Sequence, residues 1–212
     1  SLGKEKIGFL ICDVVGKGLE PSFTTIQLHS IFHSKIKLSD PPKMVMSKLN
    51  ESIYQLRTQK NHCAAFYLSI NPLTNEMSYS DAGNGLCYLI RNNQLIALNQ
   101  YGGMILGAFH NSEYTQGEFK LEKDDFIFLT TDGTIDFKNE KSERFGITRM
   151  ENLILDIALK KNKKELLNNA IHSFKTEQGL FPDDITILTI NVTNDTAYNN
   201  TKTILSTHQT IH

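Results

Sequence analysis

The chain has 212 residues, a formal net charge of −1, 40% hydrophobic residues and 21% charged residues. This length and composition indicate one globular domain with a substantial buried core. They give no sign of the clustered Lys and Arg with which proteins contact nucleic-acid phosphates, so we expect no nucleic-acid partner.

The three cysteines, Cys12, Cys63 and Cys87, lack metal-ligand spacing, and their odd number disfavours a disulfide framework. No apolar run approaches the roughly 18 residues that would span a membrane, and no signal peptide opens the sequence. We therefore expect a cytoplasmic domain, which a membrane sensor could still tether in the full-length protein.

The first part of the chain predicts one strand and two helices. The apolar run 7–12 predicts a buried strand that ends at Asp13. A glycine-containing loop, 14–18, leads to an apolar stretch, 23–32, that predicts a helix. A second helix is predicted after Pro42, because apolar residues recur every three or four positions from 45 to 56.

The rest of the chain predicts mainly strands, followed by a second helix pair. Strands are predicted as an antiparallel meander at 64–70, 76–81, 86–91 and 94–98, and further on at 117–121, 125–131 and 185–192. The helices are predicted at 147–157 and 166–174. Helix pairs separated by antiparallel strands predict an α+β fold with two sheets in the middle and helices outside.

We make a separate prediction for each end of the chain. The sequence opens almost inside the strand at 7–12, so we expect a domain over 1–193 that lacks its first strand and is cut from a longer protein. Residues 194–212 are rich in Thr, Asn, Ser and His with few apolar residues, which predicts a flexible tail.

Four carboxylates adjoin apolar strands. Asp13 follows the strand at 7–12, Asp132 follows that at 125–131, and Asp183 and Asp184 precede that at 185–192. Opposite ends of antiparallel strands can meet at one rim. Carboxylates gathered there would repel one another unless a cation lies between them. Mg²⁺ and Mn²⁺ prefer such oxygen ligands, so the pattern predicts a metal site.

Taken alone, Asp132-Gly133 and Asp183-Asp184 are more often solvated turns, and Asp13-Val14-Val15-Gly16 is a weak pattern. The metal site follows only from their combination. Other chemistries have less support. The sequence contains no Gly-x4-Gly-Lys-Ser/Thr phosphate loop, no His-Glu-x-x-His and no Gly-x-Ser-x-Gly. None of the three cysteines is followed six positions later by the Arg of a cysteine phosphatase loop.

Six segments of the sequence resemble, in family order, the motifs of the SpoIIE/RsbU-type phosphatases, bacterial relatives of protein phosphatase 2C. They are Asp13-Val14-Val15-Gly16-Lys17-Gly18-Leu19 (D-V-S-G-K/H-G-V), Phe66-Tyr67 (F-Y), Asp81-Ala82-Gly83-Asn84 (N-A-G-H), Gly102-Gly103-Met104-Ile105-Leu106-Gly107 (G-G-x-x-L-G), Thr131-Asp132-Gly133-Thr134 with Phe145-Gly146 (T-D-G-[LV] with F-G), and Asp183-Asp184-Ile185-Thr186 (D-D-[IV]-T).

The resemblance implies an αββα sandwich and a metal-dependent protein serine/threonine phosphatase. It implies that Asp13 bridges two metals, Mn²⁺ or Mg²⁺, and that the Val14 carbonyl, Asp132 and Asp183 complete the protein ligands; whether Asp184 also ligates stays open. Two such ions, about 3.5–4 Å apart, activate a shared water for in-line attack on phosphorus. Val15 stands where the family has Ser, and we expect this departure to tune the site.

The resemblance also implies partners. The substrate would be a phosphoserine or phosphothreonine on a STAS-type anti-anti-sigma protein, and an upstream sensor or regulatory domain would lie on the same longer chain. Family members carry an acidic G-G-D-[FY]-[YF]-D segment before the first motif, whereas residues 1–6 here hold only Glu5 as an acid. We therefore expect partial metal occupancy and an open strand edge that could support a homodimer. The alternative is a weak or inactive member that binds a partner or senses a signal.

Overall fold

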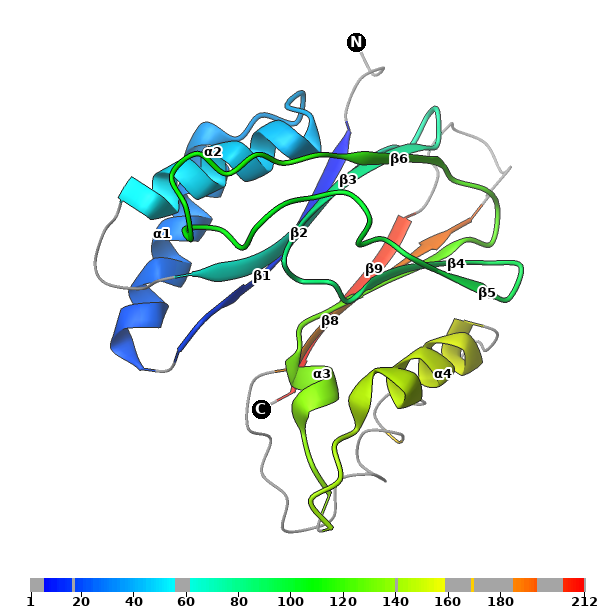
Figure 1. Cartoon of the computed structure of the whole chain (residues 1–212). Helices are drawn as coiled ribbons and strands as arrows, with labels where there is room; N and C mark the ends of the chain where they lie inside the picture. The colour runs from blue at the N-terminus through cyan, green and yellow to red at the C-terminus, as the bar shows by residue number, and fades with distance from the viewer. Residues whose placement is uncertain are drawn as a thin grey trace. The chain divides into compact units, whose positions relative to one another are not determined.

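The computed structural model describes residues 6–16, 18–55, 62–139, 141–158, 169, 185–193 and 204–211 (Figure 1). The chain divides into two compact units. The first unit comprises Ser1–Gly85, Leu98–Glu122 and Asn194–Thr203, and the second comprises Leu86–Ala97, Lys123–Thr193 and Ile204–His212. Each unit is built around one antiparallel sheet. Within the described part of the chain, no helix is long and apolar enough to cross a membrane.

The sheet of the first unit has four strands in the order β1-β2-β3-β6. These strands are β1 (Ile7–Val14), β2 (Cys63–Asn71), β3 (Glu76–Ala82) and β6 (Gly117–Lys120). The register places Asp13 opposite Ala64, and Asp81 opposite Phe66. Paired residues share a face of the sheet, and residues two apart along a strand do too. Asp13 and Asp81 therefore lie on the same face.

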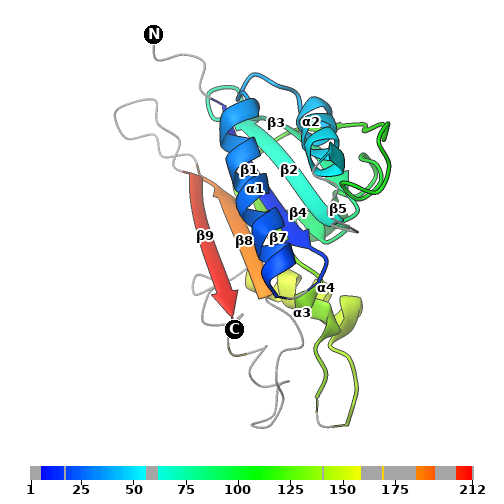
Figure 2. The same ribbon diagram turned by 90° about the vertical axis from the view of Figure 1, so that its left-hand side faces the viewer.

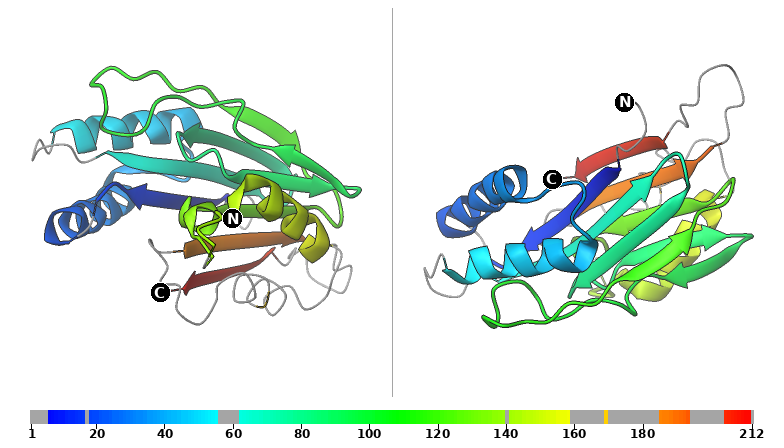
Figure 3. Two further views of the ribbon diagram at one scale, coloured as in Figure 1. Left: turned by 60° about the horizontal axis from the view of Figure 1, so that its bottom comes forward. Right: turned by 90° about the horizontal axis from the view of Figure 1, so that it is seen from above.

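Two helices, α1 (Leu19–Lys35) and α2 (Pro42–Gln55), cover one face of this sheet (Figures 2 and 3). Leu28 of α1 and Val45, Met46 and Leu49 of α2 belong to the buried core. On β1, the residues packed against this core are Leu10, Cys12 and Val14. Because side chains alternate along a strand, Asp13 lies on the face away from the helices.

The sheet of the second unit has the order β5-β4-β7-β8-β9 and is antiparallel throughout. Its strands are β4 (Cys87–Arg91), β5 (Gln94–Ala97), β7 (Phe126–Thr130), β8 (Ile185–Val192) and β9 (Ile204–Ile211). A short helix, α3 (Gly133–Asp136), follows β7. Helix α4 (Gly146–Ala158) then lies beside this sheet (Figure 3). Its side chains Met150, Ile154 and Ile157 belong to a buried core that includes Phe126 and Phe128.

Most predicted elements are confirmed with small shifts at their ends, but the predicted meander is wrong. Strands β2 and β3 pair in the first sheet, whereas β4 and β5 pair in the second. The chain changes sheet at the Gly83-Asn84-Gly85 turn, where Gly83 and Gly85 have φ of +81° and +68°. Glycine reaches this left-handed region without strain, so the turn can redirect the chain between two strands.

Three other predictions differ from the structure or lie outside it. Strand β1 continues through Asp13 to Val14, so this carboxylate lies inside the strand rather than after it. Strand β9 occupies 204–211, within the segment 194–212 that the sequence predicts to be a flexible tail. It pairs along all of β8, and it includes Ile and Thr residues that favour strands. The predicted helix at 166–174 lies outside the described residues, apart from Asn169.

Candidate metal centre

Asp13 is the penultimate residue of β1, and its side chain is half-buried. The ladder to β2 holds the backbone on both sides of it: Val14 pairs with Cys63, and the Val15 N–H donates to the His62 carbonyl at 2.9 Å. The chain then turns into α1 through Gly16 and Gly18, whose φ values are +112° and +99°. The Asp13 carboxylate is thus carried by a fixed strand end rather than by a mobile loop.

Asp132 follows the fully buried strand β7 and is the N-cap residue of α3. Its side chain is exposed and makes no capping hydrogen bond to the helix. Its carbonyl oxygen accepts the N–H groups of Ile135 at 2.9 Å and Asp136 at 3.1 Å. The backbone at Asp132 is therefore bonded into the helix while its carboxylate is not used as a cap.

Threonines fix the backbone beside Asp132. The Thr131 N–H donates to the Thr186 carbonyl at 3.2 Å, and the Thr186 N–H donates to the Thr131 hydroxyl at 3.2 Å. The Thr134 hydroxyl donates to the Thr131 carbonyl at 2.7 Å. Together these bonds join the end of β7 to the start of β8. Asp183, three residues before Thr186, lies outside the described residues, as does Asp184.

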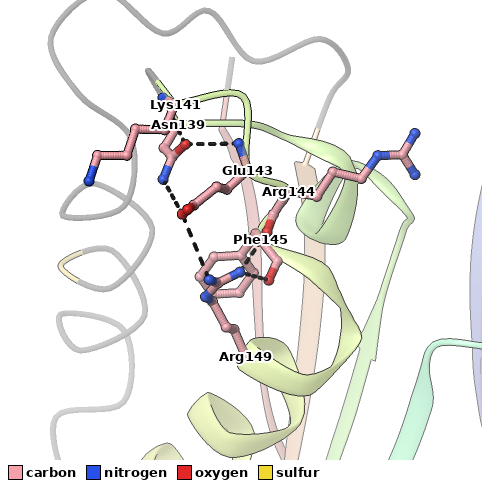
Figure 4. A network of polar contacts seen from close by, with 6 residues as sticks. All are labelled: Asn139, Lys141, Glu143, Arg144, Phe145 and Arg149. Atoms are coloured by element: carbon pink, nitrogen blue, oxygen red, sulfur yellow. Dashed lines mark hydrogen bonds and ion pairs between the residues drawn. The ribbon is translucent and has the colours of Figure 1, made fainter.

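The chain leaving α3 folds back on itself before α4. The Phe137 and Phe145 rings stack with centroids 4.9 Å apart, and the Phe145 N–H donates to the Phe137 carbonyl at 2.9 Å. Between them, the Asn139 side-chain oxygen accepts the Glu143 N–H at 3.0 Å, and Arg149 of α4 donates to the Phe145 carbonyl at 3.1 Å (Figure 4). These contacts hold the segment that follows Asp132 in one conformation.

The donor atoms fit a hard divalent cation. Asp13 and Asp132 offer carboxylate oxygens, and Val14 offers a carbonyl oxygen, which are ligands that suit Mg²⁺ and Mn²⁺. Asp13 belongs to the first unit and Asp132 to the second. The described residues contain no group of three or more His, Cys, Asp or Glu side chains placed to hold a metal ion.

Sequence reasoning assigned no role to Asp81, although it lies in one of the quoted motifs. Its side chain is 8% exposed at the end of β3. The carboxylate accepts the N–H groups of Asn84 at 3.0 Å and Gly85 at 3.2 Å. Burial nevertheless raises the pKa of Asp81 to about 6. Asp81 stands where the family motif has Asn, and this replacement was the signal in the sequence that could have identified it. An Asn side chain could accept the same two N–H groups without placing a charge in a buried position.

Sequence reasoning also missed the relationship between Cys12 and Cys63, which depends on the register of two strands far apart in the chain. The register of β1 against β2 makes them diagonal neighbours on the helix-facing side of the sheet. The neighbouring Cys63 thiol and burial raise the pKa of Cys12 well above its usual range.

Comparison with known proteins identifies the family. Residues 3–193 match the family described as Stage II sporulation protein E (SpoIIE). The chain belongs to the SpoIIE family. This confirms the family that the six sequence motifs indicated.

The SpoIIE-family chain resembles the phosphoserine phosphatase RsbU of Bacillus subtilis, with 25% identity over 192 residues. That alignment covers 88% of this chain and 56% of RsbU, so the chain spans little more than half of that relative. The SiaA-PP2C domain of Pseudomonas aeruginosa has a similar structure, with a TM-score of 0.72 and 17% identity over 87% of this chain and 79% of that domain.

A third similar structure is the catalytic domain of the serine/threonine protein phosphatase PstP, described in complex with two manganese ions. Its TM-score is 0.60, with 13% identity over 92% of this chain and 94% of that domain. These likenesses confirm the predicted fold class, the α+β αββα sandwich of protein phosphatase 2C.

Proposed function

We propose that this SpoIIE-family chain is a metal-dependent protein serine/threonine phosphatase that hydrolyses phosphoserine or phosphothreonine. The observation that carries the proposal is Asp132, an exposed carboxylate that follows a buried strand, on a backbone fixed by threonines, without serving as a cap for its own helix. The name of RsbU as a phosphoserine phosphatase and the fold shared with PstP support the same reaction class.

In this proposal the metal ligands are the carboxylates of Asp13, Asp132 and Asp183 and the carbonyl of Val14, and the metals are Mn²⁺ or Mg²⁺. When bound, two such cations supply an activated water and neutralise the phosphoryl oxygens. The chain's own contribution is positioning. Asp13 lies in the β1–β2 ladder, and the backbone just before Asp132 is held by the two hydrogen bonds between Thr131 and Thr186.

The proposed substrate is a phosphorylated STAS-domain protein, as the family resemblance implies. The chain spans 56% of RsbU, which leaves room for an upstream sensor or regulatory domain in a longer protein. A second candidate function is a weak or inactive member that binds a partner. Val15 and Asn84 replace the Ser and His of the family motifs, and we expect these departures to tune the metal site rather than abolish it.

The decisive experiment is hydrolysis of phosphopeptides by the chain after removal of divalent metals and after re-addition of Mn²⁺ or Mg²⁺. We expect release of phosphate from phosphoserine or phosphothreonine peptides only when metal is present. Equal activity in excess EDTA would contradict the metal-dependent mechanism. No activity at any Mn²⁺ concentration, together with retained binding of a STAS-domain protein, would favour the non-catalytic alternative.

A further inference from the structure

Helix α1 carries two histidines one turn apart near its C-terminal end. His29 and His33 are separated by four residues, so their side chains lie on the same face of the helix. Their rings are in contact, with centroids 4.4 Å apart and an interplanar angle of 57°. The helix is regular up to its end, where the Ile36 N–H donates to the Phe32 carbonyl at 3.3 Å. A continuous helix therefore holds the two imidazoles side by side.

Both rings line a groove between α1 and β1. The groove has a volume of about 300 Å³, and its other walls include the apolar side chains of Leu10, Leu28 and Phe32. The two histidines are nevertheless exposed to solvent. A small ion can therefore reach the imidazole nitrogens without any movement of the backbone.

The charges around this histidine pair do not oppose a bound cation. Among the described residues that line the groove, none is Lys or Arg. Lys35, the one lysine of α1, donates to the Ser52 hydroxyl of α2 at 3.3 Å, so its ammonium group is directed toward the neighbouring helix. Cations at the end of a helix interact favourably with its dipole, and His33 and Lys35 are the basic residues of the last turn. That role does not account for His29, which lies outside this turn.

Two imidazoles on one helix face are donors for a borderline transition metal. Imidazole nitrogen suits Zn²⁺, Ni²⁺ and Cu²⁺, whereas Mg²⁺ and Mn²⁺ prefer oxygen. The same four-residue separation on a helix holds Zn²⁺ in His-Glu-x-x-His metalloproteases. Zn–N bonds are about 2.0–2.1 Å long, so two nitrogens on one tetrahedral Zn²⁺ lie about 3.3 Å apart. Rings with centroids 4.4 Å apart can bring their nitrogens to that separation by side-chain rotation alone.

We propose that His29 and His33 form a binding site for Zn²⁺. It differs from the proposed oxygen-donor centre in its ligands and in its place, because α1 covers the face of the first sheet away from the Asp13 side chain. Since the described residues contain no group of three metal-ligating side chains, the two imidazoles are the protein ligands and water fills the other positions. The bound ion joins two turns of α1 and so stabilises this end of the helix.

A calorimetric Zn²⁺ titration of the whole chain in excess Mg²⁺ tests the site, because Mg²⁺ competes for oxygen ligands but not for imidazole. We expect His29→Gln and His33→Gln each to weaken Zn²⁺ binding by about 100-fold or more, since the second ligand of a chelate acts at a high effective concentration. The double variant should bind no more weakly than either single variant. His110→Gln is the matched control and should equal the parent, because His110 is exposed and its ring contacts Tyr54 rather than another histidine.

Hydrogen exchange measured by mass spectrometry locates the bound ion. We expect Zn²⁺ to slow amide exchange in peptides that cover residues 26–36 of the parent and to leave the same peptides of His29→Gln unchanged. Parental Zn²⁺ affinity in both single variants, or Zn²⁺ binding that leaves exchange in α1 unchanged, would overturn the proposal. Losses of affinity that add up in the double variant would also overturn it, because they would mean that the two histidines do not share one ion. None of these measurements depends on phosphatase activity.

Discussion

Thr131 and Thr186 are joined by two hydrogen bonds: the Thr131 N–H donates to the Thr186 carbonyl, and the Thr186 N–H donates to the Thr131 hydroxyl, both at 3.2 Å. This side-chain contact continues the β7–β8 ladder beyond its last paired residues, Thr130 and Ile187. It fixes the backbone next to Asp132 and the backbone three residues after Asp183. This polar network therefore directly adjoins Asp132, one of the proposed ligands.

The Thr130→Val substitution tests this network. The Thr130 hydroxyl is completely buried and lies 3.0 Å from the Thr186 carbonyl oxygen and 3.1 Å from the Thr134 hydroxyl. Removing it leaves both groups with one partner fewer, so we expect the free energy of unfolding to fall by about 1–2 kcal/mol in urea titrations. Thr25→Val is the matched control. Its hydroxyl is on an exposed turn of α1, and we expect a change below about 0.5 kcal/mol. Similar effects from both variants would contradict a stabilising role of the network.

Asp81 makes stability depend on pH in a defined direction. Its pKa is raised from 3.8 to about 6 in the folded chain, so the folded state binds this proton more tightly than the unfolded state. The contribution of Asp81 to stability is therefore largest below about pH 4 and is lost as the pH rises toward 6. Asp81→Asn keeps an oxygen that can accept the Asn84 and Gly85 N–H groups and removes the charge.

We expect Asp81→Asn to stabilise the chain at pH 7.5 by about 1–3 kcal/mol and to change stability little at pH 4. Chemical denaturation at the two pH values measures the difference. Asp124→Asn, an exposed turn residue in the second unit, is the control and should show no such pH-dependent gain. A loss of stability in Asp81→Asn at pH 7.5 would show that the buried charge is favourable rather than costly.

The ion pair between Arg91 and Asp125 gives a prediction about the second unit. The Arg91 Nε–H donates to one Asp125 carboxylate oxygen at 3.0 Å, and an Nη–H donates to the other at 2.7 Å. The Asp125 side chain is 1% exposed. Arg91→Ala leaves a buried carboxylate without its cation, so we expect a loss of about 3 kcal/mol. Arg144→Ala removes a pair in which both side chains are exposed and should cost less than about 1 kcal/mol. Thermal unfolding of the two variants compares the losses of stability, and we expect the lower melting temperature for Arg91→Ala. Equal melting temperatures would contradict the larger contribution of the buried ion pair.

The sequence predicts local elements well where the pattern is strong. The buried run at 125–131 became β7, and the three-to-four residue repeat after Pro42 became α2, because both signals arise from burial of one face. The sequence could not show that β3 and β4 belong to different sheets. That choice depends on the backbone at Gly83 and Gly85, whose left-handed conformation the residue type permits but does not require.

The candidate site, too, could be predicted only in part from the sequence. Asp13 and Asp132 were identified from their places beside apolar strands, and both lie at strand ends. The placement of Cys12 and Cys63 as diagonal neighbours depends on the register of β1 against β2, and a shift of one residue would put the two side chains on opposite faces. The threonine network beside Asp132 depends in the same way on the register of β7 against β8.

The most direct test of the metal-dependent mechanism is a calorimetric Mn²⁺ titration of the chain, Asp132→Asn and Asp124→Asn, with phosphate release from a phosphoserine peptide measured on the same samples. Asp132→Asn changes an exposed proposed ligand, and Asp124→Asn makes the same chemical change at another exposed position of the second unit. We predict that Asp132→Asn keeps the thermal stability of the parent while Mn²⁺ affinity and turnover fall by about 100-fold or more, and that Asp124→Asn matches the parent. Parental Mn²⁺ affinity and turnover in Asp132→Asn would contradict it.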